Sequence, residues 1–97
     1  MELERDVEQA LTRYAHEVGG MCVKFNPDSK RGMPDRIVLL PGGVVVWVEL
    51  KRPKGGSVSA VQKHRHKQLH ALGQIVVVCR TKEDARRIIE TYAATGA

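Results

Sequence analysis

The sequence predicts one α/β domain in which helices flank a mixed four-stranded sheet, in the chain order αβββαβα. Apolar residues recur at helical spacing near both ends of the chain, and short β-branched runs separated by turn signals fill its middle. In the second half, a strand, a helix and another strand follow one another, and a right-handed crossover makes those two strands parallel. The 97 residues suit a single domain over residues 1–97, and because so small a core is marginal, we expect self-association to help stabilise it.

The elements of the first half are predicted from apolar spacing, β-branched content and turn residues. The first helix is amphipathic and ends at two glycines, and a basic, glycine-containing loop over residues 27–32 interrupts the first strand. Pro41-Gly42-Gly43 is a turn signal that joins the next two strands into a hairpin. The predicted elements are a helix over residues 3–18 and strands over residues 21–26, 37–40 and 44–48.

The second half begins with a segment that can continue neither a strand nor a helix. Residues 52–57 contain a proline and two glycines, which predicts a mobile basic loop. Ser59 and Gln62 then fit a capping box, in which a serine and a glutamine three residues later satisfy the first backbone donors of a helix. The predicted elements are a helix over residues 59–72, an apolar strand over residues 74–79 and a helix from residue 81.

Composition excludes several classes of protein. Hydrophobic residues make up 42% of the chain and charged residues 28%, as in ordinary globular domains. No apolar run approaches the length of a membrane span, and the acidic N-terminal residues do not resemble a secretory leader, so we expect a cytoplasmic protein without membrane partners. Cys22 and Cys79 lie in segments that favour buried strands and lack zinc spacing, which predicts two reduced core thiols.

The distribution of charge indicates a polyanionic partner. The net charge is +5, and no acidic residue lies between Glu49 and Glu83, whereas the first seventeen residues hold five acids and two bases. A basic segment of this kind favours nucleic acid as the partner, although basic stretches are often only solvated surface.

The candidate catalytic residues of the sequence are Asp35, Glu49 and Lys51. Side chains two apart on a strand share a face, so Glu49 and Lys51 point one way and Leu50 the other. If the hairpin turn is centred on Gly42, Asp35 lies opposite Glu49 with Cβ atoms roughly 4.5 to 5.5 Å apart, an arrangement of like charges that favours a cation between them. A register slip of one residue would place the two acids on opposite faces.

Such a set suits the hydrolysis of phosphodiesters, which needs an activated water and a cation that neutralises developing charge. Mg²⁺ and Mn²⁺ prefer oxygen ligands, which Asp35, Glu49 and the backbone carbonyl of Leu50 would supply, and Lys51 could position or deprotonate the attacking water. The alternative to a catalytic role is a structural one, in which Asp35 is an acid in a turn and Glu49 and Lys51 form a cross-strand ion pair.

The same residues resemble a known family. Residues 31–36 (Arg-Gly-Met-Pro-Asp-Arg), residues 48–51 (Val-Glu-Leu-Lys) and Gln62 match the VRR-NUC domain of the PD-(D/E)XK nuclease superfamily, and the element order matches over almost the whole chain. The resemblance implies a restriction-endonuclease-like fold in a stand-alone phage or bacterial protein. It implies a Mg²⁺- or Mn²⁺-dependent endodeoxyribonuclease without an organic cofactor, acting on branched DNA such as four-way (Holliday) junctions. It also implies a homodimer, in the cytoplasm of a bacterial or phage-infected cell.

The resemblance assigns roles to individual residues. Glu8 matches an acidic position on the family's first helix, where it would bind metal directly or through water, and Glu4 is the alternative if that helix is rotated. The catalytic set by motif is Asp35, Glu49, Lys51 and Gln62, with Asp35 and Glu49 as metal ligands and Gln62 as a supporting residue.

Basic residues around the predicted site are expected to contact DNA phosphates, which position a duplex without reading its sequence. His66 and His70 share a helix face, but we expect no acid near them, so the histidines at positions 64, 66 and 70 are predicted to lie on the surface or face DNA. The predicted DNA-binding residues are Lys30, Arg31, Arg36, Arg52, Lys54, Lys63, Arg65 and Lys67.

Two other functions fit the sequence less well. A non-catalytic nucleic-acid-binding accessory module with a nuclease-like fold would have no use for clustered acids beside phosphate. A restriction-type enzyme with base specificity would need a recognition segment, for which 97 residues leave little room.

Overall fold

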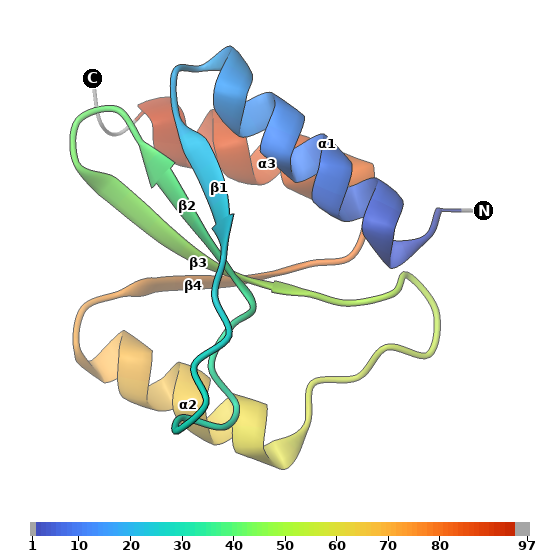
Figure 1. Ribbon diagram of the computed structural model, residues 1–97, viewed down its shortest axis with the longest axis vertical. Coiled ribbons are helices and arrows are strands. Elements are labelled where there is room, and N and C mark those ends of the chain that lie inside the picture. Colours follow the sequence, from blue (N-terminus) through green and yellow to red (C-terminus); the bar gives the residue numbers. More distant parts are fainter. Residues whose placement is uncertain (1, 95–97) are drawn as a thin grey trace.

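The computed structural model describes residues 2–94 and confirms the predicted αβββαβα order (Figure 1). No helix in this part of the chain is long and apolar enough to cross a bilayer. The elements are α1 (Glu4–Glu17), β1 (Met21–Lys24), β2 (Arg36–Leu40), β3 (Val44–Leu50), α2 (Ala60–Ala71), β4 (Ile75–Cys79) and α3 (Lys82–Ala93).

The strands form one mixed sheet in the order β1-β2-β3-β4. β2 is antiparallel to both of its neighbours and β4 is parallel to β3, as the crossover rule predicts. Leu40 pairs with Val44 across the turn, and Gly42 and Gly43 adopt φ values of +85° and +80°, which glycine tolerates best. This pairing confirms the register predicted by centring the turn on Gly42.

The three helices are divided unequally between the two faces of the sheet. Figure 1 shows α1 and α3 side by side on one face and α2 on the other. Leu69 is the buried apolar residue of α2, and it lies outside the main core. That core fills the space between the sheet and α1 and α3, and includes Val7, Leu11, Ala15, Val38, Val46, Val48, Leu50, Cys79, Ala85 and Ile89.

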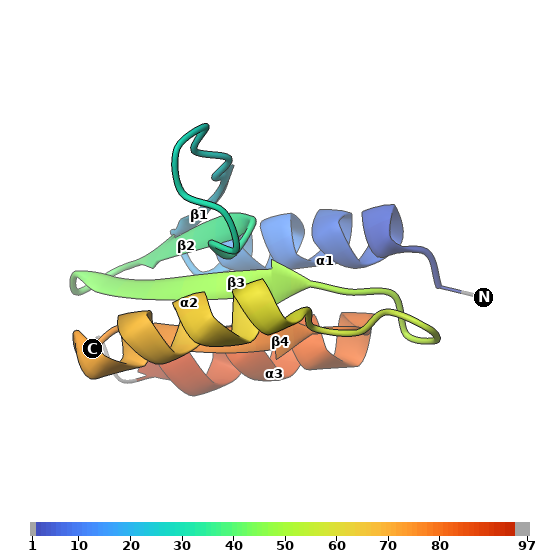
Figure 2. The ribbon, with the colours of Figure 1, turned by 90° about the horizontal axis from the view of Figure 1, so that it is seen from below.

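β1 differs from the prediction of a buried strand. It ends at Lys24 rather than at residue 26, and Met21 and Val23 are 49% and 38% exposed. The reason is its place in the sheet: β1 is an edge strand, and α2 packs on β4 at the opposite edge (Figure 2). Met21 and Val23 therefore lie on an uncovered face, together with the 37% exposed Leu39 that pairs with Met21.

The loop between β1 and β2 is fixed against α2. Arg65 donates a hydrogen bond through Nε to the carbonyl oxygen of Arg31 at 3.1 Å. Gly32, with φ +82°, sits so close to α2 that a Cβ atom on it would lie 2.6 Å from the carbonyl oxygen of Val61. The loop therefore delivers Asp35 to the start of β2 from a defined position.

Candidate active site

Asp35 lies directly before β2 and is held by hydrogen bonds from both neighbouring strands. The backbone N–H of Leu50 donates to Oδ1 of Asp35 at 3.1 Å, and the N–H of Phe25 donates to the Asp35 carbonyl oxygen at 2.9 Å. Arg36 pairs with Val48, so the next position along the hairpin places Asp35 opposite Glu49. The two acids thus meet on one face, as predicted, rather than on opposite faces.

Glu49 is a charged residue in the interior of the protein, with only 3% of its surface exposed. Its Oε2 accepts a hydrogen bond from Nε2 of Gln62 at 3.2 Å and lies 3.9 Å from Nζ of Lys51. Its Oε1 lies 3.5 Å from Nε2 of His66 and has no hydrogen-bond partner. The structure therefore brings together Asp35, Glu49, Lys51 and Gln62, the set predicted from the sequence.

The carboxyl groups of Asp35 and Glu49 both have raised pKa values. Burial, followed by the negative charge of Asp35, raises the pKa of Glu49 to about 7, against an opposing effect from Lys51. Burial also raises the pKa of Asp35, against the stabilising hydrogen bond from the backbone N–H of Leu50. A positive charge between these groups would favour their ionised forms.

Gln62 has two structural roles at once. Its side-chain Oε1 accepts from the backbone N–H of Ser59 at 2.9 Å, while its own backbone N–H donates to the Ser59 hydroxyl at 3.1 Å. This is the predicted capping box, and it leaves the amide Nε2 free to reach Glu49. Capping and support of the site are therefore compatible.

The prediction for His66 was wrong. Its side chain is 12% exposed, and Glu49 is the acid that the sequence analysis did not expect near it. Burial, followed by the positive charges of His70 and Lys51, lowers the pKa of His66. The sequence contained a signal for this position, because His66 lies four residues after Gln62 and therefore on the same helix face.

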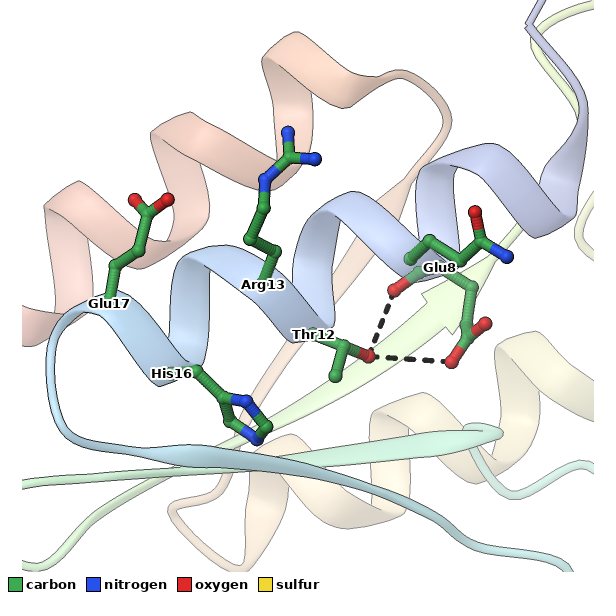
Figure 3. A pocket seen from close by; sticks show the side chains of 6 residues that line it. Glu8, Thr12, Arg13, His16 and Glu17 are labelled. Carbon is green, nitrogen blue, oxygen red and sulfur yellow. Dashed lines mark hydrogen bonds between the residues drawn. The ribbon is translucent and has the colours of Figure 1, made fainter.

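The acids of α1 lie beside the site without a hydrogen bond to Asp35 or Glu49 in the described part of the chain, and Glu8 has partners of its own. Glu8 faces a shallow hollow on α1, where the Thr12 hydroxyl donates to the Glu8 carbonyl at 3.0 Å and contacts its carboxylate at 3.4 Å (Figure 3). The Nε of Arg36 also lies 4.0 Å from the Glu8 carboxylate. Glu4, in contrast, makes only the smallest contribution to the raised pKa of Glu49. The role of the α1 acid, with Glu8 first and Glu4 as the alternative, therefore stays a prediction.

Three of the eight predicted DNA-binding residues donate side-chain hydrogen bonds within the protein; one of them, Arg52, is exposed and donates to the Gly55 carbonyl at 3.4 Å. Arg36 is 16% exposed and donates to the Asp35 carbonyl at 2.8 Å, and Arg65 binds the Arg31 carbonyl and the Gln68 side chain. Arg80, which was not predicted, donates to carbonyl oxygens in the loop after β3. The exposed members of the predicted set are Lys30, Arg31, Arg52, Lys54, Lys63 and Lys67.

Comparisons with known proteins agree with this arrangement. The chain is 39% identical over 75 residues to "Putative nuclease p44" of Acyrthosiphon pisum secondary endosymbiont phage 1, which covers 77% of this chain and 80% of that protein. A solved structure of a VRR_NUC domain matches with a TM-score of 0.84 and 27% identity, over 92% of this chain and 96% of that one. No family model matches the sequence.

The PD-(D/E)XK nucleases share a framework in which the elements follow the order αβββαβα and two acids and a lysine lie at the ends of paired strands. This chain has that framework. The similarities to the phage protein and to the solved domain each span most of this framework. The chain belongs to the VRR-NUC family of nucleases.

Proposed function

We propose that the protein is a Mg²⁺- or Mn²⁺-dependent endodeoxyribonuclease that hydrolyses phosphodiester bonds and prefers branched DNA such as four-way junctions. The observation that carries the proposal is the Glu49 carboxylate, which is buried beside a second acid and retains an unpartnered oxygen. Burying a charge destabilises a fold, so such a group indicates a functional use. The preference for branched DNA rests on the family resemblance.

The residues at the site fit a hard divalent cation. Asp35, Glu49 and the backbone carbonyl of Leu50 offer the oxygen ligands that Mg²⁺ and Mn²⁺ prefer. Within residues 2–94, no three His, Cys, Asp or Glu side chains are grouped so that they could hold a metal ion, so the proposed ligand set consists of two carboxylates, a backbone carbonyl and water. When bound, such an ion neutralises phosphate charge and lowers the pKa of a water molecule.

Lys51 is the residue that acts on water and phosphate. Its Nζ lies 3.9 Å from Glu49, and its side chain is 18% exposed, so it can reach a phosphate that approaches from solvent. A lysine can position the attacking water, accept its proton when deprotonated, and stabilise negative charge on the phosphate, whereas an arginine remains charged. Gln62 fixes one oxygen of Glu49, and Leu50 fixes one oxygen of Asp35.

We retain Glu8 as the acid of α1 that would bind the cation directly or through water, with Glu4 as the alternative. The Glu8 carboxylate lies 4.0 Å from Arg36, which donates to the Asp35 carbonyl. Glu4, in the first turn of α1, makes only the smallest contribution to the raised pKa of Glu49.

DNA is the substrate class that the charge favours. Exposed lysines and arginines lie in the loops on either side of the site and along α2, and the acid-free segment between Glu49 and Glu83 contributes most of them. Contacts of this kind hold a sugar-phosphate backbone and leave the bases unread.

A homodimer would cover the exposed apolar strip of Met21, Val23 and Leu39. This edge of the sheet lacks a covering helix, and unpaired strand edges readily pair with another chain. Val23→Asp should therefore lower the mass measured by light scattering from dimer to monomer. Leu72→Asp is the matched control, because Leu72 is 75% exposed on α2 and should leave the mass unchanged. A monomeric wild-type protein would refute the dimer.

Cleavage of a four-way junction, a flap and a linear duplex, each with Mg²⁺, Mn²⁺ or chelator, tests the proposed reaction. We expect metal-dependent cutting that is fastest on the junction, and its loss in Lys51→Ala with DNA binding retained. Lys82→Ala, an exposed lysine at the start of α3, is the control. Binding without cutting under all conditions would instead support the non-catalytic accessory module.

A further inference from the structure

Two buried polar atoms face each other across the site. His66 Nε2 and Glu49 Oε1 are 3.5 Å apart, and in residues 2–94 they are the only buried side-chain nitrogen or oxygen atoms without a hydrogen-bond partner. Buried polar groups are almost always partnered, so two unpartnered atoms in adjacent positions indicate an interaction between them. The interaction involves the acid on which the proposed function depends.

His66 also occupies a particular position on α2. Gln62 and His66 are four residues apart, so they lie one helical turn apart on the same face. Gln62 contacts Oε2 of Glu49 at 3.2 Å, and His66 approaches Oε1. Each oxygen of this carboxylate therefore faces a different side chain of α2.

We propose that His66 is a positioning residue that donates from Nε2–H to Oε1 of Glu49, so that α2 fixes both oxygens of one carboxylate. A single hydrogen bond leaves a carboxylate free to rotate about its terminal torsion, whereas a second contact fixes the plane. A carboxylate oxygen has two lone-pair sites, so a hydrogen bond from His66 would leave one site of Oε1 for a cation. The inference rests on the proposed function, because the plane of Glu49 matters for an acid that binds a metal.

The alternative is that Nε2 binds the cation directly. Hard cations such as Mg²⁺ favour oxygen over imidazole nitrogen, which supports the donor role. The separation of 3.5 Å needs to shorten by only a few tenths of an ångström to reach a normal hydrogen bond.

Calorimetric titration of the full chain with Mn²⁺ in the absence of DNA tests the proposal. His66→Phe should weaken Mn²⁺ binding about tenfold or more, the effect expected when a residue that orients a metal ligand is lost. His66→Gln places an amide N–H near the same point and should restore most of the affinity. His64→Phe, an exposed histidine of the same helix, should bind as the wild type does.

Several results would overturn the proposal. Equal Mn²⁺ affinity for His66→Phe and the wild type would remove the role of His66, as would a His66→Gln variant that folds but binds no better than His66→Phe. Pulsed EPR of the Mn²⁺-bound wild type should show no directly coordinated nitrogen, and such a signal would make His66 a ligand instead. If the wild type cuts DNA with Mn²⁺ while His66→Phe is unchanged, only this inference fails. If the wild type neither binds Mn²⁺ nor cuts, the proposed function fails with it.

Discussion

Glu49→Gln should make the protein more stable at pH 8 in the absence of divalent metal. The substitution keeps the shape of a side chain that is 3% exposed and removes a charge that the interior does not accommodate well. Burial and the neighbouring charge of Asp35 are the main causes of the raised pKa of Glu49. Neither of them destabilises a neutral side chain at position 49.

The rise in the pKa of Glu49 sets the size of the effect. A change from 4.5 to about 7 corresponds to at most about 3 to 4 kcal/mol, at 1.36 kcal/mol per pH unit. Relaxation of the site and loss of the contact with Lys51 reduce this, so we expect about 1 to 3 kcal/mol. In a domain of this size 1 kcal/mol shifts the melting temperature by about 4 to 8 °C, so the variant should melt roughly 4 to 24 °C higher.

The difference in stability between Glu49→Gln and the wild type should increase as the pH rises. The folded protein keeps the Glu49 proton up to about pH 7, whereas the unfolded chain releases it near pH 4.5. Proton binding at Glu49 therefore stabilises the wild type fully below pH 4.5, and this contribution is lost as the pH rises through 7. Wild type and variant should melt alike near pH 4 and differ most at pH 8.

Thermal unfolding followed by circular dichroism, in EDTA at pH 4, 6 and 8, measures these differences. Adding Mn²⁺ at pH 8 should raise the melting temperature of the wild type and have no effect on Glu49→Gln. Glu83→Gln, whose side chain is 84% exposed on α3, is the control and should show no such pattern. The reasoning would be refuted if Glu49→Gln melted below the wild type at pH 8, or if the difference between them were the same at every pH.

Two further predictions concern the loop before Asp35 and the surface of α2. Gly32→Ala should destabilise the protein by about 1 to 3 kcal/mol in urea unfolding, because its Cβ would lie 2.6 Å from the carbonyl oxygen of Val61 in addition to the strain at φ +82°. Gly55→Ala, with φ +77° and no atom nearer than 3.5 Å, measures the strain alone, and an equal loss in both variants would contradict the steric argument. Replacing Lys63 and Lys67 with Ala should reduce the slope of log affinity against log salt by about 0.9 per lost phosphate contact in fluorescence anisotropy. An unchanged slope would show that these lysines do not touch DNA.

Local rules were sufficient for the hairpin and for the start of α2. The turn at Pro41-Gly42-Gly43 fixes the pairing of its flanking strands, and the side-chain period of two then determines which residues share a face with Glu49. Ser59 and Gln62 satisfy each other within four residues, so their hydrogen bonds also follow from the sequence. The two acids and the glutamine could be placed for these reasons.

Rotation of helices and coverage of the sheet could not be predicted in the same way. An apolar stripe indicates which face of α1 is buried, but the choice between Glu4 and Glu8 depends on the angle at which α1 crosses the sheet. His66 was misplaced because its partner, Glu49, is 17 residues away in sequence; the i,i+4 spacing from Gln62 was the signal that could have placed it. β1 looked buried because β-branched and apolar content does not show which strand lies at an uncovered edge.

The small apolar contact between α2 and the rest of the domain affects how the site unfolds. Leu69 is the one buried apolar residue of this helix, yet the helix carries Gln62 and His66, two of the side chains that face the Glu49 carboxylate. Elements with few buried contacts open locally at free energies well below that of global unfolding. Undocking of α2 would return Glu49 to water while α1, α3 and the sheet stay folded. A variant of this helix could therefore lose its metal site and its activity and still show the cooperative melting transition of an intact domain.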